Sequence, residues 1–202
     1  MRKGKLIVLS GPSGTGKGTI CKELIDRGVF DLSISMTTRA PRTGEAHGVH
    51  YYFASREEFE QTIRDDGFLE YARIYENYYG TPKAPVLEKL EKGIDVMLEI
   101  EMQGALQVKA HYPEAILIFV LPPDLKTLKQ RLTGRGTESP AQIELRTRAS
   151  LEEIRKIYDY DYSVINDRLE DAVSDVMSII RAEHLKVGTD TVQLVKKFEE
   201  EQ

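Results

Sequence analysis

A glycine-rich segment follows a short apolar stretch near the start of the chain, and this junction constrains the fold more than any other feature. The apolar stretch covers residues 5–10, and the next residues are Gly11-Pro12-Ser13-Gly14-Thr15-Gly16-Lys17-Gly18-Thr19. Glycines let the backbone curl so that successive N–H groups point into one concavity. A strand that leads through such a loop into a helix is typical of phosphate binding. The sequence therefore predicts a P-loop, with Lys17 reaching the β- and γ-phosphates.

The residue after the lysine departs from the strict form of this motif. That position normally carries Ser or Thr, whose hydroxyl holds Mg²⁺. Here it is Gly18, and the hydroxyl comes one residue later at Thr19. Thr19 is thus the candidate hydroxyl ligand of Mg²⁺. The alternative, a plain glycine turn between strand and helix, leaves the full spacing of the motif unexplained.

Apolar runs alternate with amphipathic segments along the rest of the chain. Strands are expected over residues 5–10, 94–101, 115–121 and 164–165, and helices over 19–27, 103–111, 125–132 and 169–185. This alternation predicts an α/β fold with a parallel sheet core and helices on both faces. Residues 33–81 differ, because they are rich in tyrosine and alternate in polarity. They predict an inserted small α+β lobe of antiparallel strands, with a capping box at Ser55–Glu58 that starts a helix.

Composition excludes several classes of protein. Lys and Arg total 28 against 33 Asp and Glu, a formal net charge of -5, which argues against duplex nucleic acid as the main partner. The longest apolar run, residues 115–121, is too short to span a bilayer. The single cysteine, Cys21, excludes an internal disulfide and is expected to be a small buried hydrophobe. We therefore expect a cytoplasmic protein without a membrane partner.

Two further segments carry groups suited to nucleotides. Arg39 and Arg42 flank Pro41 in one stiff turn, and two guanidinium forks so placed suit a second phosphate. Glu99 and Glu101 are expected on one face at the C-terminal end of a buried strand, where such sheets bind ligands. The alternative for these carboxylates is a strand end that surfaces into solvent.

Several motifs in order resemble those of the guanylate kinase family. They are the P-loop, TTRAPRTGE, YENYYGT, LEIEMQG, RLTGRGTES and VIND, and the resemblance runs from about residue 5 to about 185. It implies an enzyme that phosphorylates GMP, and also dGMP, with ATP as donor and Mg²⁺ as cofactor. It also implies a domain over residues 4–185 and a tail over 186–202. Within that domain the core is 4–32 and 83–185, the GMP-binding lobe about 33–82 and a mobile lid about 134–148.

The resemblance also implies roles for individual residues. It implies that the GMP phosphate is bound by Ser35, Arg39, Arg42, Tyr51 and Tyr79, and that Glu45 orients an arginine. It implies that the guanine edge is recognised by Glu70, Thr81 and Glu101, although the family more often has aspartate at the last of these positions. Glu99 and Thr19 face the metal, and Asn166 contacts the adenine end of ATP. The transferring group is surrounded by Lys17, Arg39 and the lid residues Arg135 and Arg146.

Two other functions remain open from the sequence. Guanylate-kinase-like domains of scaffold proteins bind phosphopeptides without catalysis, but their P-loops are degraded and this one is complete. A kinase for a different small phosphorylated acceptor is the second alternative, and Glu70 and Thr81 argue against it because they suit guanine. The chain is expected to be a monomer or a homodimer.

Overall fold

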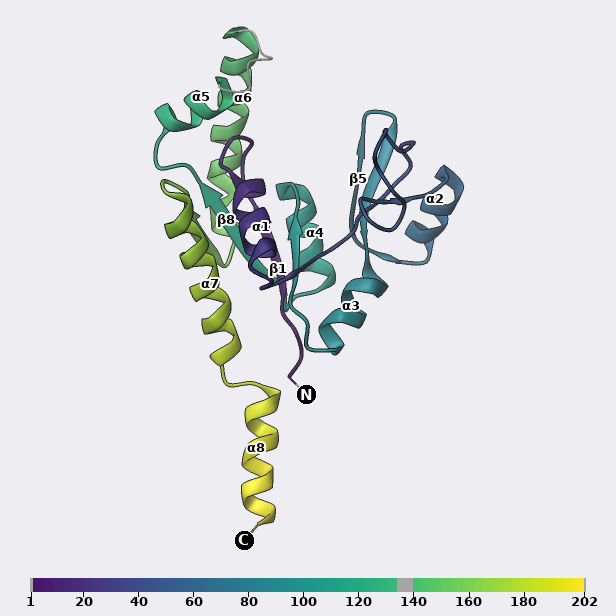
Figure 1. Cartoon of the computed structure of the whole chain (residues 1–202), viewed down its shortest axis with the longest axis vertical. Helices are drawn as coiled ribbons and strands as arrows, with labels where there is room; N and C mark the ends of the chain where they lie inside the picture. Colours follow the sequence, from purple (N-terminus) through teal and green to yellow (C-terminus); the bar gives the residue numbers. More distant parts are fainter. Residues whose placement is uncertain (1, 134–139, 202) are drawn as a thin grey trace.

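A five-stranded parallel sheet forms the centre of the computed structural model, which describes residues 2–133 and 140–201 (Figure 1). The strand order is β2-β7-β1-β8-β9, and all four neighbouring pairs are parallel. The bounds are β1 Leu6–Ser10, β2 Asp31–Leu32, β7 Val96–Glu99, β8 Ile116–Leu121 and β9 Tyr162–Ile165. The predicted parallel sheet is confirmed.

Helices cover both faces of this sheet. Alternate residues of β1 point to opposite sides: Ile7 and Leu9 face one core cluster, and Leu6 and Val8 face the other. The first cluster contains side chains from α1 (Lys17–Asp26) and α7 (Leu169–Leu185). The second contains side chains from α3 (Lys83–Glu91) and α4 (Met102–His111). The other helices of the sheet domain are α5 (Leu125–Thr133), α6 (Pro140–Ile154) and a 3-10 turn (Arg155–Asp159).

A second, four-stranded sheet lies beside the core and carries its own helix (Figure 1). Its order is β4-β3-β6-β5, with β3 Met36–Thr37, β4 Tyr52–Phe53, β5 Phe68–Ile74, β6 Asn77–Pro82 and α2 Arg56–Arg64. The capping box predicted at Ser55 is present, since Glu58 N–H donates to Ser55 Oγ and Ser55 N–H donates to Glu58 Oε2. The prediction of antiparallel strands is confirmed for the β3–β6 and β5–β6 pairs but not for β3 and β4. β3 and β4 are parallel, because the long connection between them lets the chain return and run in the same direction.

Two other expectations fail at element boundaries. The strand predicted over 94–101 ends at Glu99, and Glu101 is the residue that precedes α4. Glu99 and Glu101 therefore do not share a strand face. Helix α3 has no counterpart among the predicted elements, because Pro85 interrupts its pattern. Proline is nevertheless tolerated in the first turn of a helix, and that is where Pro85 lies.

The tail that follows α7 forms another helix. Helix α8 runs from Thr189 to Glu200 and extends away from the body of the molecule, near the N-terminus (Figure 1). No helix in the described ranges is both long and apolar enough to cross a membrane. Cys21 is 2% exposed, and its burial raises the pKa of the thiol to about 12, as expected for a small hydrophobe.

Candidate active site

The predicted P-loop connects β1 to α1 at the C-terminal edge of the sheet. Gly11, Gly14 and Gly16 have φ values of 140°, 87° and 88°, which favour glycine. The ammonium of Lys17 donates to the carbonyl oxygens of Gly11 at 2.6 Å and Pro12 at 2.9 Å. The positive charge therefore lies over the same concavity that the backbone amides of the loop line, and this favours an anion there.

Asn166, the residue after β9, supports this loop, and Arg131 of α5 holds Asn166 in turn. Asn166, which is 6% exposed, donates from Nδ2 to the carbonyl oxygen of Thr15 at 2.8 Å. Arg131 donates to the backbone carbonyl of Asn166 at 2.9 Å. A Cβ at Gly16 would lie 2.3 Å from Asn166 Nδ2, so the close approach requires glycine. No role was predicted for Arg131, because its partner lies 35 residues away in the sequence.

A depression of about 390 Å³ lies on this side of the loop. Its lining residues are Gly14, Gly16, Thr19, Arg131, Asn166, Asp167 and Leu169. Asn166 was expected at the adenine end of ATP, and it borders this depression while its amide nitrogen holds the loop. This depression offers space for a nucleotide base beside the P-loop.

Arg146 on α6 reaches the P-loop from the other side. Its Nη2 donates to Ser13 Oγ at 2.6 Å. Arg148, two residues further on, is exposed and pairs with Glu144 at 3.3 Å. The predicted lid residue Arg135 and the loop 134–139 lie outside the described residues, and residues 140–148 of the expected lid are helical. Of the described lid arginines, Arg146 is thus the one that contacts the phosphate-binding loop.

The Arg39–Glu45 ion pair organises the arginine-bearing turn. Arg39 Nη2 and Glu45 Oε1 are 2.9 Å apart, and the two side chains are 15% and 19% exposed. Glu45 Oε2 also accepts from the backbone N–H of Arg42 at 2.7 Å. Both contacts lower the pKa of Glu45, with the Arg39 hydrogen bond the larger cause. The guanidinium of Arg39 lies 5.5 Å from the ring centre of Tyr51, which fixes its plane.

A cavity of about 340 Å³ lies between the two sheets and reaches the P-loop lysine. Its walls come from both sheets and from the start of α4. The lining residues are Lys17, Ser35, Tyr51, Glu70, Ala72, Ile74, Tyr79, Gly80, Glu99, Ile100, Glu101, Gln103 and Gly104. Five of the residues predicted to bind substrate are thus brought together with Lys17, whereas Arg39, Arg42, Glu45 and Thr81 lie outside this lining.

Glu70 is a buried carboxylate in this cavity. It is 7% exposed, and Thr81 Oγ1 donates to its Oε1 at 2.6 Å. Burial is the main cause that raises the pKa of Glu70, and the nearby Glu101 raises it further. Gly104 lets the backbone of α4 approach this carboxylate closely, because a Cβ at that position would lie 3.0 Å from Glu70 Oε2. The LEIEMQG motif contained this glycine, but an isolated glycine in a helical segment did not reveal which side chain it faces.

The two predicted metal ligands lie on different sides of the start of α1. Glu99 faces Gly18, since a Cβ there would lie 3.4 Å from Glu99 Oε1, and Glu99 lines the same cavity as Lys17. Thr19 instead lines the depression beside Asn166. Among the residues that the structure describes, no group of three or more His, Cys, Asp or Glu side chains could hold a metal ion. One carboxylate beside a phosphate site fits Mg²⁺, which is commonly bound by one or two carboxylates together with substrate phosphates.

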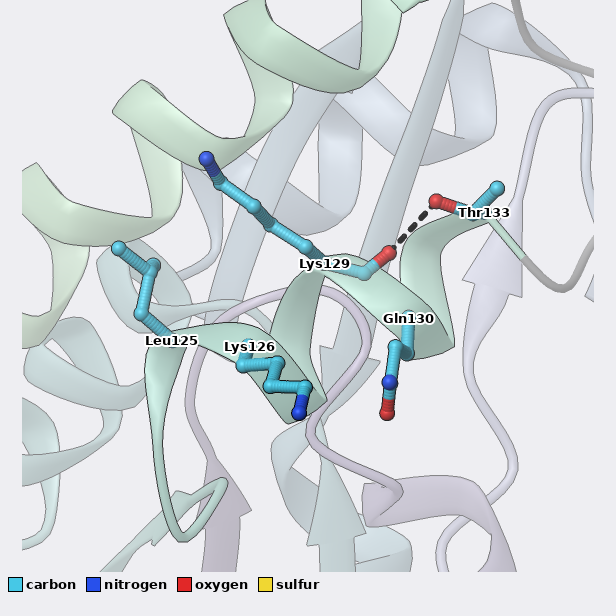
Figure 2. A pocket seen from close by; sticks show the side chains of 5 residues that line it. All are labelled: Leu125, Lys126, Lys129, Gln130 and Thr133. Carbon is cyan, nitrogen blue, oxygen red and sulfur yellow. Dashed lines mark hydrogen bonds between the residues drawn. The ribbon is translucent and has the colours of Figure 1, made fainter.

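A larger depression of about 630 Å³ lies over the outer side of α5 (Figure 2). All five of its lining residues, Leu125, Lys126, Lys129, Gln130 and Thr133, belong to that one helix. The hydrogen bond drawn there is local to the helix, since Thr133 Oγ1 donates to the backbone carbonyl of Lys129, four residues earlier. Lys17 and the carboxylates of Glu70 and Glu99 line the cavity between the two sheets instead, so this depression is not the candidate site.

Comparisons with known proteins agree with this geometry. The family model for guanylate kinase matches residues 3–183. The chain is 54% identical over 202 residues to a guanylate kinase of Clostridioides difficile, covering 100% of this chain and 98% of that one. It is 50% identical over 200 residues to a guanylate kinase of Caldanaerobacter subterraneus, covering 98% of this chain and 97% of that one.

A solved structure shares the fold as well as the sequence. The crystal structure of guanylate kinase from Anaplasma phagocytophilum superposes with a TM-score of 0.71 at 30% identity, over 93% of this chain and 89% of that one. Family, curated relatives and solved structure thus agree over nearly the whole chain. Together with a P-loop lysine and a buried carboxylate that line one cavity, they show that this chain belongs to the guanylate kinase family.

Proposed function

We propose that Lys17, Arg39, Arg135 and Arg146 surround the phosphoryl group as it passes directly from ATP to a phosphate oxygen of GMP. The family gives the reaction itself, in which ATP phosphorylates GMP to GDP. The main observation behind the proposed site is the cavity lined by both Lys17 and Glu70. It places a cation suited to phosphate and a carboxylate suited to guanine in one space. The acceptor is already an anion, so no strong general base is needed, and catalysis is positioning and charge stabilisation.

Guanine selection is assigned to Glu70, Thr81 and Glu101. Guanine presents N1–H and N2–H₂ as adjacent donors, which one carboxylate can accept together. Adenine has an acceptor at N1, which would face a carboxylate lone pair. Thr81 already donates to one oxygen of Glu70, which leaves the other oxygen, on the Gly104 side, for the base. A site built on buried hydrogen-bonding groups can reject an analogue that lacks its partners by ~10⁴ or more.

The GMP phosphate is assigned to Ser35, Arg39, Arg42, Tyr51 and Tyr79. Ser35 and both tyrosines line the cavity, and Arg39 stacks on Tyr51. Glu45 positions Arg39 and the Arg42 backbone without contacting the cavity itself. The ATP phosphates are assigned to the P-loop, residues 11–19, with Asn166 at the side of the base.

Mg²⁺ is part of the proposal, with Glu99 as its protein carboxylate. When bound, the ion neutralises charge on the ATP phosphates. Glu99 lies beside Gly18 at the start of α1, in the cavity that contains Lys17. Thr19 is the predicted hydroxyl ligand, and its position on the other side of the loop makes Glu99 the better-supported contact.

The domain boundaries follow the two sheets. We assign the core to 4–32 and 83–185, the GMP-binding lobe to about 33–82 and the lid to about 134–148. Closure of lobe and lid would exclude water, which otherwise competes with GMP for the phosphoryl group. We also assign the reaction to the cytoplasm and include dGMP as an acceptor, because no assigned contact requires the 2′-hydroxyl.

An acceptor panel tests the proposal. The purified chain, ATP and Mg²⁺ are supplied in turn with GMP, dGMP, AMP, UMP and a sugar phosphate, and ADP formation is measured. We expect turnover with GMP and dGMP and little with the other acceptors. Equal turnover of AMP would contradict the roles of Glu70 and Thr81, and GMP binding without turnover would favour a binding module.

A further inference from the structure

Helix α8 carries an exposed apolar stripe outside the segment that the family model matches. Val192, Leu194, Val195 and Phe198 are 51%, 51%, 49% and 59% exposed. Their spacing of three and four residues places them on one face, while Gln193 and Glu200 lie on the other. The family model ends at residue 183, before this helix begins. The enzyme domain of the family therefore does not account for the stripe.

The tip of α8 is acidic. Glu199, Glu200 and Glu201 follow one another at its C-terminal end. Negative charge at a helix C-terminus opposes the helix dipole, so these carboxylates do not stabilise the helix that carries them. In the part of the chain that the structure describes, none of the three lies within 4 Å of a cationic side chain. Their charge is available to an external partner.

A basic depression of about 320 Å³ lies at the other end of α8, below the sheet edge opposite the P-loop. It is lined by Arg2, Lys3, Gly4, Lys5, Leu6, Tyr112, Glu114, Glu183, His184, Lys186, Gly188 and Thr191. Lys3 and Lys186 have acidic partners, Glu91 and Glu183. The charged groups of Arg2 and Lys5 form no ion pair within 4 Å among the residues 2–133 and 140–201, although Asp95 accepts from the backbone N–H of Lys5 and lies near both cations. The depression therefore offers at least two cations to an incoming acid.

We propose that two copies of this chain form a two-fold symmetric dimer through antiparallel α8 helices, with each acidic tip at the basic depression of the partner. Helix α8 has 12 residues and is about 18 Å long, so an antiparallel pair of these helices brings the C-terminal tip of each to the N-terminal end of the other. With the axis between Leu194 and Val195, Phe198 faces the partner's Thr191 and Glu201 faces the partner's Gly188. Both partner residues line the depression. One arrangement thus covers the stripe and brings opposite charges together.

The dimer requires both contacts, the apolar pairing of the α8 helices and the pairing of each acidic tip with the basic depression. Four apolar side chains per helix fall short of the roughly 800 Å² that each partner buries in a standard interface. The tip and the depression enlarge the contact and add complementary charge. An isologous contact of this kind closes on itself, so it gives a dimer rather than a filament. The P-loop lies at the opposite edge of the sheet, so pairing leaves the proposed active site open (Figure 1).

Light scattering after size-exclusion chromatography tests the proposal on the full chain. We expect a concentration-dependent mass that reaches twice the 23.0 kDa of one chain and dissociates more readily as salt rises. Phe198→Glu should raise the dimer dissociation constant by on the order of 30-fold, as loss of a hot-spot aromatic residue does. The matched control Gln193→Glu adds the same charge on the opposite face and should leave the dimer intact.

Charge reversal separates this pairing from other dimers. Glu201→Lys at the edge of the stripe should weaken the dimer more than Glu200→Lys on the far face. Arg2→Glu should weaken it too, and Arg2→Glu combined with Glu201→Lys should restore it. GMP phosphorylation should be unchanged throughout, so failure of this proposal is distinguishable from failure of the proposed function. A mass of one chain at every concentration, or no rescue in the double variant, would overturn it.

Discussion

The side-chain amide of Asn166 donates to the carbonyl oxygen of Thr15 at 2.8 Å, across 151 positions of sequence. The residue that follows the last strand of the sheet thereby supports the loop that follows the first. Because Gly16 leaves no room for a side chain next to this amide, the loop and its support fit as a unit. The contact makes the shape of the phosphate loop depend on the far end of the domain.

Replacing Asn166 with Ala should affect both stability and ATP binding. Loss of a buried hydrogen bond that leaves a carbonyl unsatisfied costs about 1–3 kcal/mol of unfolding free energy. We expect that loss in urea denaturation, together with a KM for ATP that rises more than the KM for GMP. Ser163→Ala, at an exposed residue of β9 that does not line the depression beside the P-loop, is the matched control. A variant as stable as the parent, with unchanged ATP affinity, would show that the support is dispensable.

Glu70→Gln should weaken GMP selection. The amide keeps an oxygen that can accept from Thr81, but its NH₂ group would meet the guanine donors and repel them. We expect kcat/KM for GMP to fall by ~10²-fold or more, since a mispaired buried group is costly. Steady-state kinetics with GMP and AMP measure the change. Thr81→Ser, which keeps the hydroxyl that contacts Glu70, should retain the preference for GMP.

The same substitution should change how stability depends on pH. Burial raises the pKa of Glu70 in the folded chain above its ordinary value of 4.5. The folded state therefore holds the proton more tightly, and stability is lost as pH rises through the folded pKa. We expect Glu70→Gln to be more stable than the parent at pH 7, and the difference to close below pH 4.5. Denaturation at a series of pH values tests this, and a difference that grew on acidification would reverse the sign.

Arg146→Ala should lower turnover far more than ATP affinity. Arg146 reaches Ser13 in the P-loop and is assigned to the transferring group. An arginine in that role contributes ~10³ to 10⁵ in rate. Nucleotide titration and steady-state kinetics separate binding from turnover. Arg148→Ala removes an exposed arginine from the same helix and should change neither, while equal losses of kcat and affinity in Arg146→Ala would refute the assignment.

Glu45→Gln should impair GMP use without touching the substrate. The carboxylate holds Arg39 and the backbone of Arg42, and a misplacement of about 1 Å can cost ~10² in rate. The lowered pKa of Glu45 means that its contribution is present above the ordinary value of 4.5 and lost as pH falls through the lowered pKa. We expect kcat/KM for GMP in the parent, but not in the variant, to follow that loss. Glu57→Gln, in the exposed first turn of α2, is the control.

Local patterns predicted the parallel core well and the inserted lobe less well. Helix α7 has the predicted bounds, residues 169–185, because its apolar face repeats without interruption. The parallel pairing of β3 with β4 was not predicted, since two-residue strands carry too little alternation to fix their direction. Helix α3 was missed because of Pro85, and α8 lies in the segment that was expected to be a peripheral tail.

The candidate site shows the same division. Lys17 lies in the glycine loop, Glu45 contacts Arg39 in the same turn, and Glu70 lies on β5, and short motifs suggest such positions because they specify a loop or a strand together with its side chains. The contacts of Asn166 with Thr15, of Arg131 with Asn166 and of Gly104 with Glu70 join distant segments. No spacing within the chain encodes such pairs, so they emerge only from the packed structure.

Strand β1 lies between β7 and β8, and its residues Leu6, Ile7, Val8 and Leu9 are at most 1% exposed. The phosphate loop therefore begins at the most enclosed segment of the domain. Folding of the sheet has already removed most of the conformational entropy of the loop's anchor, at about 1–2 kcal/mol per residue. An arriving triphosphate meets donors that are already aligned, and its affinity need not compensate for ordering them.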